Sequence, residues 1–167
     1  KMLKIAFPLN LTHAKITASA PYGWIDRASN GEEEPCQGWL DLSGLGPYGP
    51  QGLSLLNDSK YGYDALDNEL RLSILRSPIY AFHRPREIVP GVTYHYTDQG
   101  EQVVRYRLLP HAGGWEEADP ARASLALHAP LVAQPVEPHQ GNWQADRSLL
   151  RIEPGHIVAT TIKLAEN

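Results

Sequence analysis

The sequence has one cysteine, no long apolar run and no block of charged residues longer than three. Because Cys36 is alone, no disulfide can form within the chain, which suits a reducing, cytoplasmic setting. No stretch approaches the roughly 18 consecutive apolar residues that a membrane-spanning helix needs. The apolar run within residues 1–10 is too short for a signal peptide. We therefore expect no membrane partner.

The charge is also low, with a formal net value of −4. This balance gives no electrostatic reason to expect a nucleic acid or an anionic membrane as partner. The longest acidic run is Glu32-Glu33-Glu34. Neighbouring acids on an extended chain point to opposite faces, so Glu33 and Glu34 cannot by themselves flank one glycosidic bond. We interpret the run as a solvated loop and predict no catalytic residue in it.

Metal ligands and a serine nucleophile are equally hard to find. No two histidines stand at His-x-His or His-x-x-x-His spacing, and Cys36 has no partner at ligand spacing. Ser59 lacks the Gly-x-Ser-x-Gly setting of a hydrolase nucleophile. We predict no metal site and no serine-type hydrolysis. The seven histidines are His13, His83, His95, His111, His128, His139 and His156.

Glycine and proline, the residues that favour turns, are abundant. Fourteen glycines and fourteen prolines are spread along the chain, which favours many short strands separated by turns. A length of 167 residues with 42% hydrophobic content suffices for one sheet-on-sheet core, so we expect a single domain over 1–167. The predicted fold class is all-β, an antiparallel β-sandwich. The expected strands are Met2–Phe7, Ala14–Ala20, Trp39–Leu42, Leu53–Leu56, Glu69–Arg76, Gln102–Leu109, Ser148–Ile152 and Ile157–Leu164.

One short helix is predicted over Pro120–His128. Asp119 is a candidate N-cap, Pro120 fits the first helical position, and Pro130 ends the segment. Two long connections, residues 78–100 and 130–146, are expected to be ordered in part by their aromatic residues.

The most informative stretch is residues 55–78, which pattern as a strand, a polar loop and a second strand in a hairpin-like unit. The loop concentrates an amide, a carboxylate, an ammonium and phenols, the groups that hydrogen-bond to sugars and stack on them. Candidate substrate-binding residues are Asn57, Asp58, Lys60 and Tyr61. Alternatively, Asn57 and Asp58 cap a turn while the tyrosines pack on the sheet.

The same stretch resembles the C-terminal β region of α-mannosidases of glycoside hydrolase family 38. Three further blocks resemble that family in the same order. They are residues 1–8, residues 22–23 with 30–35, Gln37 and Trp39, and residues 110–115. The resemblance fades after Leu131 and resumes weakly at 148–154. Family members continue beyond the last residues, so we expect a chain truncated at both ends relative to a longer parent enzyme.

The resemblance implies a sandwich of the galactose-mutarotase-like supersandwich type that follows catalytic and helical domains. It implies retaining hydrolysis of α-mannosidic bonds by the parent enzyme, with the zinc ion and the nucleophilic aspartate in a catalytic domain outside every matched segment. No catalytic residue, metal ligand or cofactor is therefore expected in this chain. The implied partners are the missing domains and an α-mannoside substrate. In larger family members a loop with a basic residue approaches the substrate rim, and the loop from Asn57 to Tyr63 is a plausible counterpart.

Two other functions stay open, a carbohydrate-binding module and a purely structural or interface domain. An exposed coplanar pair of rings would favour the module, and burial of all the rings would favour the structural role. The rings concerned are Trp24, Trp39, Tyr48, Tyr61, Tyr63, Trp115 and Trp143. An open edge near Ile157–Leu164 or an exposed apolar face also predicts a homo-oligomer.

Overall fold

The computed structural model describes residues 2–81, 87–144, 147–155 and 157–166. The chain divides into two compact units, Lys1–His128 and Ala129–Asn167. The described residues of the second unit form neither helix nor strand. The expectation of one domain over 1–167 stays a prediction. No helix among the described residues is long and apolar enough to cross a membrane.

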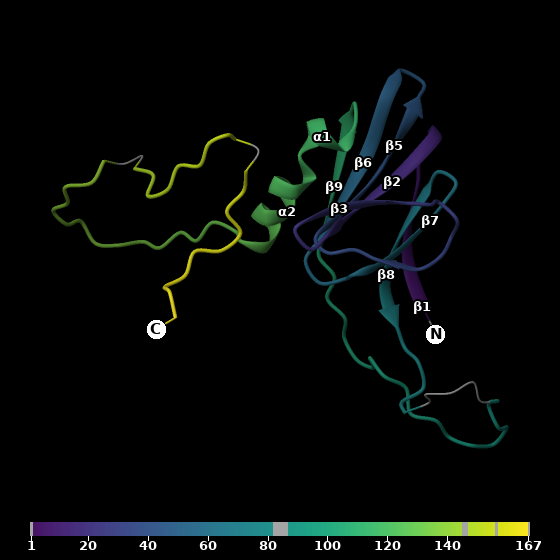
Figure 1. The fold of residues 1–167 in the computed structure, drawn as a ribbon. Helices are drawn as coiled ribbons and strands as arrows, with labels where there is room; N and C mark the ends of the chain where they lie inside the picture. Colours follow the sequence, from purple (N-terminus) through teal and green to yellow (C-terminus); the bar gives the residue numbers. More distant parts are fainter. Residues whose placement is uncertain (1, 82–86, 145–146, 156, 167) are drawn as a thin grey trace. The chain divides into compact units, whose positions relative to one another are not determined.

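The first unit is a sandwich of two antiparallel sheets (Figure 1), which confirms the predicted fold class. One sheet has four strands in the order β1 (Met2–Pro8), β8 (Glu69–Arg76), β7 (Gly62–Leu66) and β4 (Glu34–Pro35). The other has five, in the order β3 (Gly23–Arg27), β2 (Thr12–Ala20), β5 (Trp39–Gly46), β6 (Gly49–Asn57) and β9 (Tyr106–Ala112).

Period-two alternation along the strands builds the core. On β8, Leu70 and Leu72 are fully buried between the sheets, while Arg71 and Ser73 lie on the outer face. Each fully buried leucine contributes about 1.5–3 kcal/mol through the removal of apolar surface from water. The buried cluster consists of Leu11, Ile16, Ala18, Cys36, Leu40, Leu42, Leu55, Tyr63, Ala65, Leu70 and Leu72.

Two short helices follow β9, namely α1 (Trp115–Ala118) and α2 (Pro120–His128). The bounds of α2 are those predicted, and its cap is confirmed, because the Arg122 amide donates to Asp119 Oδ1 at 3.2 Å. Gly38 lets α2 lie close to the start of β5. A Cβ at Gly38 would stand 2.2 Å from Ser124 Oγ, so a larger residue there would require the Ser124 side chain or the helix to shift.

The hairpin expected in residues 55–78 is wrong in its pairing. The strands around Leu55 and Leu72 lie in different sheets. Between them in the sequence comes β7, a strand that the prediction missed. The true hairpin joins β7 to β8 through Asp67, whose φ of 53° is left-handed. The short strands β3 and β4 were also missed, since neither has a clear apolar alternation.

Three strand predictions in the C-terminal half need correction. Residues 148–152 and the described residues 157–164 form no strand, and the strand expected from Gln102 begins only at Tyr106. Alternation alone does not hold a strand, because its backbone groups need a neighbouring strand as partner. An edge at Ile157–Leu164 is therefore not a strand edge, although self-association itself stays a prediction.

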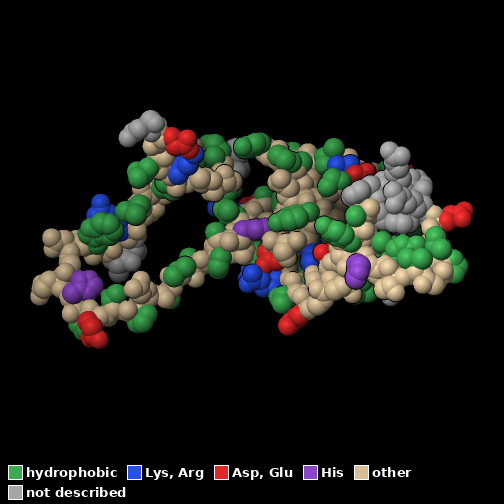
Figure 2. All heavy atoms as spheres, turned by 90° about the horizontal axis from the view of Figure 1, so that it is seen from below, with side chains coloured by type: hydrophobic (Ala, Val, Ile, Leu, Met, Phe, Trp, Pro, Cys, Tyr) green, Lys and Arg blue, Asp and Glu red, His purple; other side chains and the backbone are tan. Residues whose placement is uncertain are grey.

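The charged side chains are mixed in sign. On the face shown in Figure 2, acidic and basic side chains are interspersed, in agreement with the net charge of −4.

Candidate functional site

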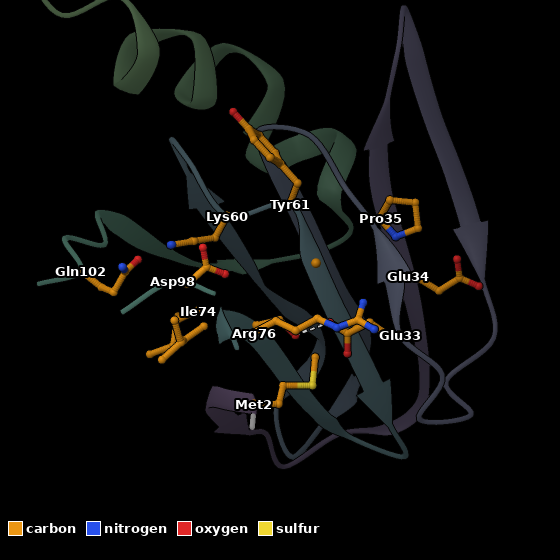
Figure 3. Close-up of a pocket in the computed structure, with 13 residues that line it drawn as sticks. Met2, Glu33, Glu34, Pro35, Lys60, Tyr61, Ile74, Arg76, Asp98 and Gln102 are labelled. Atoms are coloured by element: carbon orange, nitrogen blue, oxygen red, sulfur yellow. Dashed lines mark hydrogen bonds between the residues drawn. The ribbon is translucent and has the colours of Figure 1, made fainter. Parts of the chain in front are cut away.

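An open hollow of about 450 Å³ lies beside the four-stranded sheet (Figure 3). Strands β1, β4 and β8 contribute to its lining, together with the loop between β6 and β7 and the connection that precedes β9. The lining residues are Met2, Glu33, Glu34, Pro35, Lys60, Tyr61, Gly62, Ser73, Ile74, Leu75, Arg76, Asp98 and Gln102.

Two of the four predicted substrate-binding residues line this hollow. Lys60 is half-buried, and the Tyr61 side chain is 55% exposed. Both lie on the loop that carries the chain from β6 in one sheet to β7 in the other. Their position follows from this crossing between sheets, which the sequence pattern did not predict.

The other two residues lie behind the loop and hold it. Asn57 is fully buried, and its Oδ1 accepts a hydrogen bond from the Lys60 amide at 2.8 Å. Its Nδ2 donates to the Gln37 carbonyl at 3.4 Å. The Asp58 carboxylate pairs with Arg105 Nε at 2.7 Å. Asn57 therefore caps the turn as the bracing alternative expects, and its cap positions Lys60.

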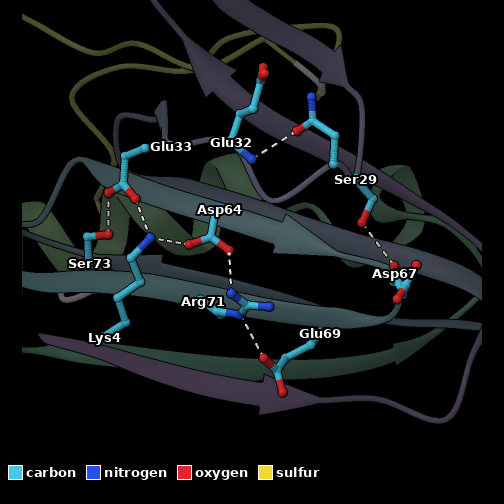
Figure 4. A network of polar contacts seen from close by, with 10 residues as sticks. Lys4, Ser29, Glu32, Glu33, Asp64, Asp67, Glu69, Arg71 and Ser73 are labelled. Atoms are coloured by element: carbon cyan, nitrogen blue, oxygen red, sulfur yellow. Dashed lines mark hydrogen bonds and ion pairs between the residues drawn. The ribbon is translucent and has the colours of Figure 1, made fainter. Parts of the chain in front are cut away.

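A network of charges covers the outer face of the four-stranded sheet (Figure 4). Lys4 on β1 contacts both Asp64 on β7 and Glu33, and Asp64 also pairs with Arg71 Nη1 at 3.3 Å. Asp64 is only 1% exposed, so its carboxylate depends on these two cations. Burial lowers the pKa of Lys4, but hydrogen bonds to Asp64 and Glu33 outweigh it and raise the pKa above 10.5.

Glu33 links this network to the hollow. It accepts from Ser73 Oγ as well as from Lys4, which fixes its carboxylate against β8. The neighbouring Glu34 pairs with Arg27 Nη1 at 2.5 Å. Both glutamates in the wall therefore already have a cationic partner, and they do not form a free facing pair of the kind that glycoside hydrolysis uses.

A second polar cluster lies on the five-stranded sheet and was missed from the sequence. Asp41 is fully buried and accepts from Ser54 Oγ at 2.6 Å and from Ser43 Oγ. His111 Nε2 lies 2.7 Å from Asp41 Oδ2. Gly52 makes room for this contact, since a Cβ there would stand 2.7 Å from His111 Cε1. The only indication of this cluster in the sequence is a single acid, Asp41, between two leucines that are buried in the core, Leu40 and Leu42.

His111 lies on β9, and its ring reaches across β6 to Asp41 on β5. Its Nδ1 is buried and has no hydrogen-bond partner among the described residues. Trp115 stacks on buried Trp39 at 5.3 Å between ring centroids.

The aromatic residues meet neither of the criteria set above. Trp39 and Tyr63 are buried, whereas Trp24, Tyr48, Tyr61 and Trp143 are between 55% and 96% exposed. The stacked pair includes a buried ring, and exposed Trp24 is tilted by 56° to Trp115. A flat exposed platform of two rings is not present in the described part of the chain.

Reactive groups can also be assessed. Among the described residues, no three His, Cys, Asp or Glu side chains converge as a metal ion requires. His83 and His156 lie outside the described residues. Burial raises the pKa of the Cys36 thiol to about 12, so it is not a nucleophile at neutral pH.

Comparison with known proteins adds a family. The model of the glycosyl hydrolases family 38 C-terminal domain matches residues 1–86, just over half of the chain. Alpha-mannosidase 2C1 of Homo sapiens is 30% identical over 177 residues, covering 100% of this chain and 15% of the relative. The Mus musculus protein is 30% identical over 176 residues, with 99% and 15% covered. Alpha-mannosidase G of Dictyostelium discoideum is 28% identical over 130 residues, with 77% and 10% covered.

Proposed function

The chain belongs to the C-terminal domain family of the family 38 glycosyl hydrolases, and we propose that it serves as the non-catalytic β domain of a longer α-mannosidase. The observation that carries this proposal is coverage, because the similarity runs along the whole chain yet spans only 15% of the first two relatives. In that longer polypeptide the domain supports a catalytic part that hydrolyses α-mannosidic bonds with retention.

The donor groups of the chain support a non-catalytic role. The wall glutamates Glu33 and Glu34 are engaged by Lys4 and Arg27, and the described residues gather no set of three metal ligands. They therefore do not fit the zinc ion that the family implies. The proposal places zinc and the nucleophile in another part of the longer polypeptide, in a reducing compartment such as the cytoplasm, where unpaired Cys36 stays reduced.

The Lys60–Tyr61 loop is proposed to form part of the substrate rim. Lys60 has three ammonium donors for sugar hydroxyls, and Tyr61 offers a ring face to a sugar. Asn57 holds the loop from behind through the Lys60 amide, so the two side chains are presented on a fixed backbone. The competing structural role expects the loop only to brace the two sheets.

Kinetics of the longer enzyme test the rim. Lys60→Ala should lower kcat/KM for an aryl α-mannoside by about tenfold, the loss expected for a hydrogen bond from a charged donor worth about 1.5 kcal/mol. The melting temperature should stay unchanged, because half-exposed Lys60 contributes little to stability. Lys15→Ala is the matched control, since Lys15 pairs with Asp26 at 2.7 Å away from the hollow.

Two results would contradict the proposal. Unchanged kinetics for Lys60→Ala would remove the loop from the rim and leave an architectural domain. Turnover of the aryl α-mannoside by the isolated 167-residue chain, lost on substitution of one of its own acids, would overturn the non-catalytic role.

A further inference from the structure

The two sheets end in four outer strands, and β3 differs from the other three. β1 has a register shift between Leu3 and Lys4, which interrupts its ladder. β4 is two residues long and includes Pro35, whereas β9 contains Pro110 and packs against α1. Such features keep an edge from pairing with a further strand. β3 pairs with β2 over all five residues without a register shift and contains no proline. It is the edge best suited to accept a strand.

The hydrogen-bond register of β3 leaves two residues facing outward. Ala20 and Gly23 flank the two-residue turn between β2 and β3, so they form a hydrogen-bonded pair. Such pairs alternate along an antiparallel ladder, so the next one on β3 is at Ile25. The N–H and C=O groups of Trp24 and Asp26 therefore point away from β2. Among the described residues, no backbone hydrogen bond outside the strand pairing reaches either of them.

Side chains on both faces of this edge are apolar and incompletely covered. Trp24 lies on the outer face and is 59% exposed, and Ile25 lies on the opposite face and is 42% exposed. The acid at the edge, Asp26, already pairs with Lys15 at 2.7 Å and accepts from Thr17 Oγ1 at 2.8 Å. An adjacent strand would therefore cover apolar surface on both faces without meeting an unpaired charge.

The size of the edge decides what can occupy it. A strand of five residues is about 17 Å long and a sheet layer is about 10 Å thick, so β3 offers roughly 170 Å² of contact. A stable complex of separate chains buries about 800 Å² on each partner. This edge alone is therefore too small to hold a second copy of the chain. A strand within the same polypeptide needs much less contact, because its effective concentration is on the order of millimolar.

We propose that β3 accepts an extended strand from another part of the longer α-mannosidase polypeptide, which continues the five-stranded sheet. The inference rests on the proposed function, in which this chain is one part of a polypeptide whose relatives it spans by 15%. The incoming strand hydrogen-bonds to the outward backbone groups of Trp24 and Asp26. It carries β-branched or aromatic side chains beside Trp24 and Ile25. The attachment surface is thus a strand that the proposed substrate rim does not use.

Hydrogen exchange of the longer enzyme tests the pairing, read at single amides by mass spectrometry with electron-transfer fragmentation. Ile25 is the internal control, because its amide pairs with β2 whether or not a further strand is present. The amides of Trp24 and Asp26 should exchange at rates within about tenfold of that of Ile25. If both exchange as fast as in an unstructured peptide while Ile25 stays slow, the edge is open and the proposal is wrong.

A pair of variants isolates one outward N–H group. Asp26→Ala and Asp26→Pro both remove the side-chain contacts with Lys15 and Thr17, but only proline also removes the N–H. Because that group faces away from β2, the strand tolerates the proline. In the longer enzyme Asp26→Pro should speed exchange at Trp24 by roughly five- to tenfold relative to Asp26→Ala, the loss expected for one hydrogen bond between strands. Equal rates in the two variants would contradict the pairing.

The 167-residue chain alone separates this partner from a second copy. There, Trp24 and Asp26 should exchange at least about 100-fold faster than Ile25, because no further strand is present. Exchange at these two amides that slows as the chain concentration rises would show pairing between copies and overturn the proposal. None of these results depends on the kinetics of Lys60→Ala, so the β3 pairing and the substrate rim can fail independently.

Discussion

Gly52 on β6 is the residue whose replacement most directly tests the packing of the five-stranded sheet. It stands between Ser43 on β5 and His111 on β9 in the strand register. A Cβ at this position would lie 2.6 Å from Ser43 Oγ, 2.7 Å from His111 Cε1 and 2.9 Å from the Leu42 carbonyl oxygen. The first two atoms can move, but the carbonyl belongs to the β5 backbone and cannot.

The cost of Gly52→Ala follows from these contacts. Overpacking a tight site costs about 1–3 kcal/mol. Withdrawal of the His111 ring would also weaken its 2.7 Å contact with buried Asp41, and a buried group that loses a partner costs about 1–3 kcal/mol. Because the chain relaxes in part, we expect a loss of about 2–4 kcal/mol in the free energy of unfolding, equivalent to a fall of about 5–15 °C in Tm.

Urea unfolding followed by tryptophan fluorescence measures this loss. Gly23→Ala is the matched control, because a Cβ there meets no atom within 4 Å and its stability should change by less than about 1 kcal/mol. In a His111→Ala background the cost of Gly52→Ala should shrink, since the ring is gone. If Gly52→Ala unfolds within about 0.5 kcal/mol of the unaltered chain, Ser43 and His111 do not occupy the described positions.

Three further predictions concern other parts of the first unit. Lys4→Met should lower stability by about 3 kcal/mol because buried Asp64 loses a cation, whereas Lys15→Met at an exposed pair should cost under about 1 kcal/mol in the same urea assay. The folded-state pKa of Cys36 is raised from 9.0 to about 12, so its contribution to stability is complete below pH 9 and is lost as pH rises toward 12. The pH at which the chain unfolds in alkali should therefore be higher in Cys36→Ala. A thiol reagent that labels the folded chain at neutral pH would contradict the burial of Cys36. Asp119→Ala should lower stability by about 1 kcal/mol through loss of the α2 cap, and an unchanged midpoint would show that the cap contributes nothing.

Local patterns were sufficient for part of the fold. The bounds of β8 and α2 were predicted correctly, because alternation in Glu69–Arg76 and the cap at Asp119 depend only on residues near in sequence. The composition likewise predicted an all-β sandwich. The resemblance of several short blocks to family 38 was confirmed by the family match over residues 1–86.

The site residues were predicted only in part. Composition showed that the loop after β6 is rich in hydrogen-bonding groups, but it could not separate Asn57, which is buried, from Tyr61, which is exposed. The role of each depends on which sheet the chain enters next. The hollow itself unites residues 2, 33, 60, 76 and 102, which no local window contains.

The sequence by itself determined which segments alternate, where α2 begins and which residues have groups that suit a sugar. The tertiary structure alone decided that Lys60 faces the hollow, that Lys4 neutralises Asp64, and that Asp41 meets His111. The physical reason is that alternation sets the face on which a side chain lies, whereas strand order sets its neighbours. Strand order depends on the packing of the whole sandwich, including β7, whose pattern is too short to be recognised before its partner β8 is in place.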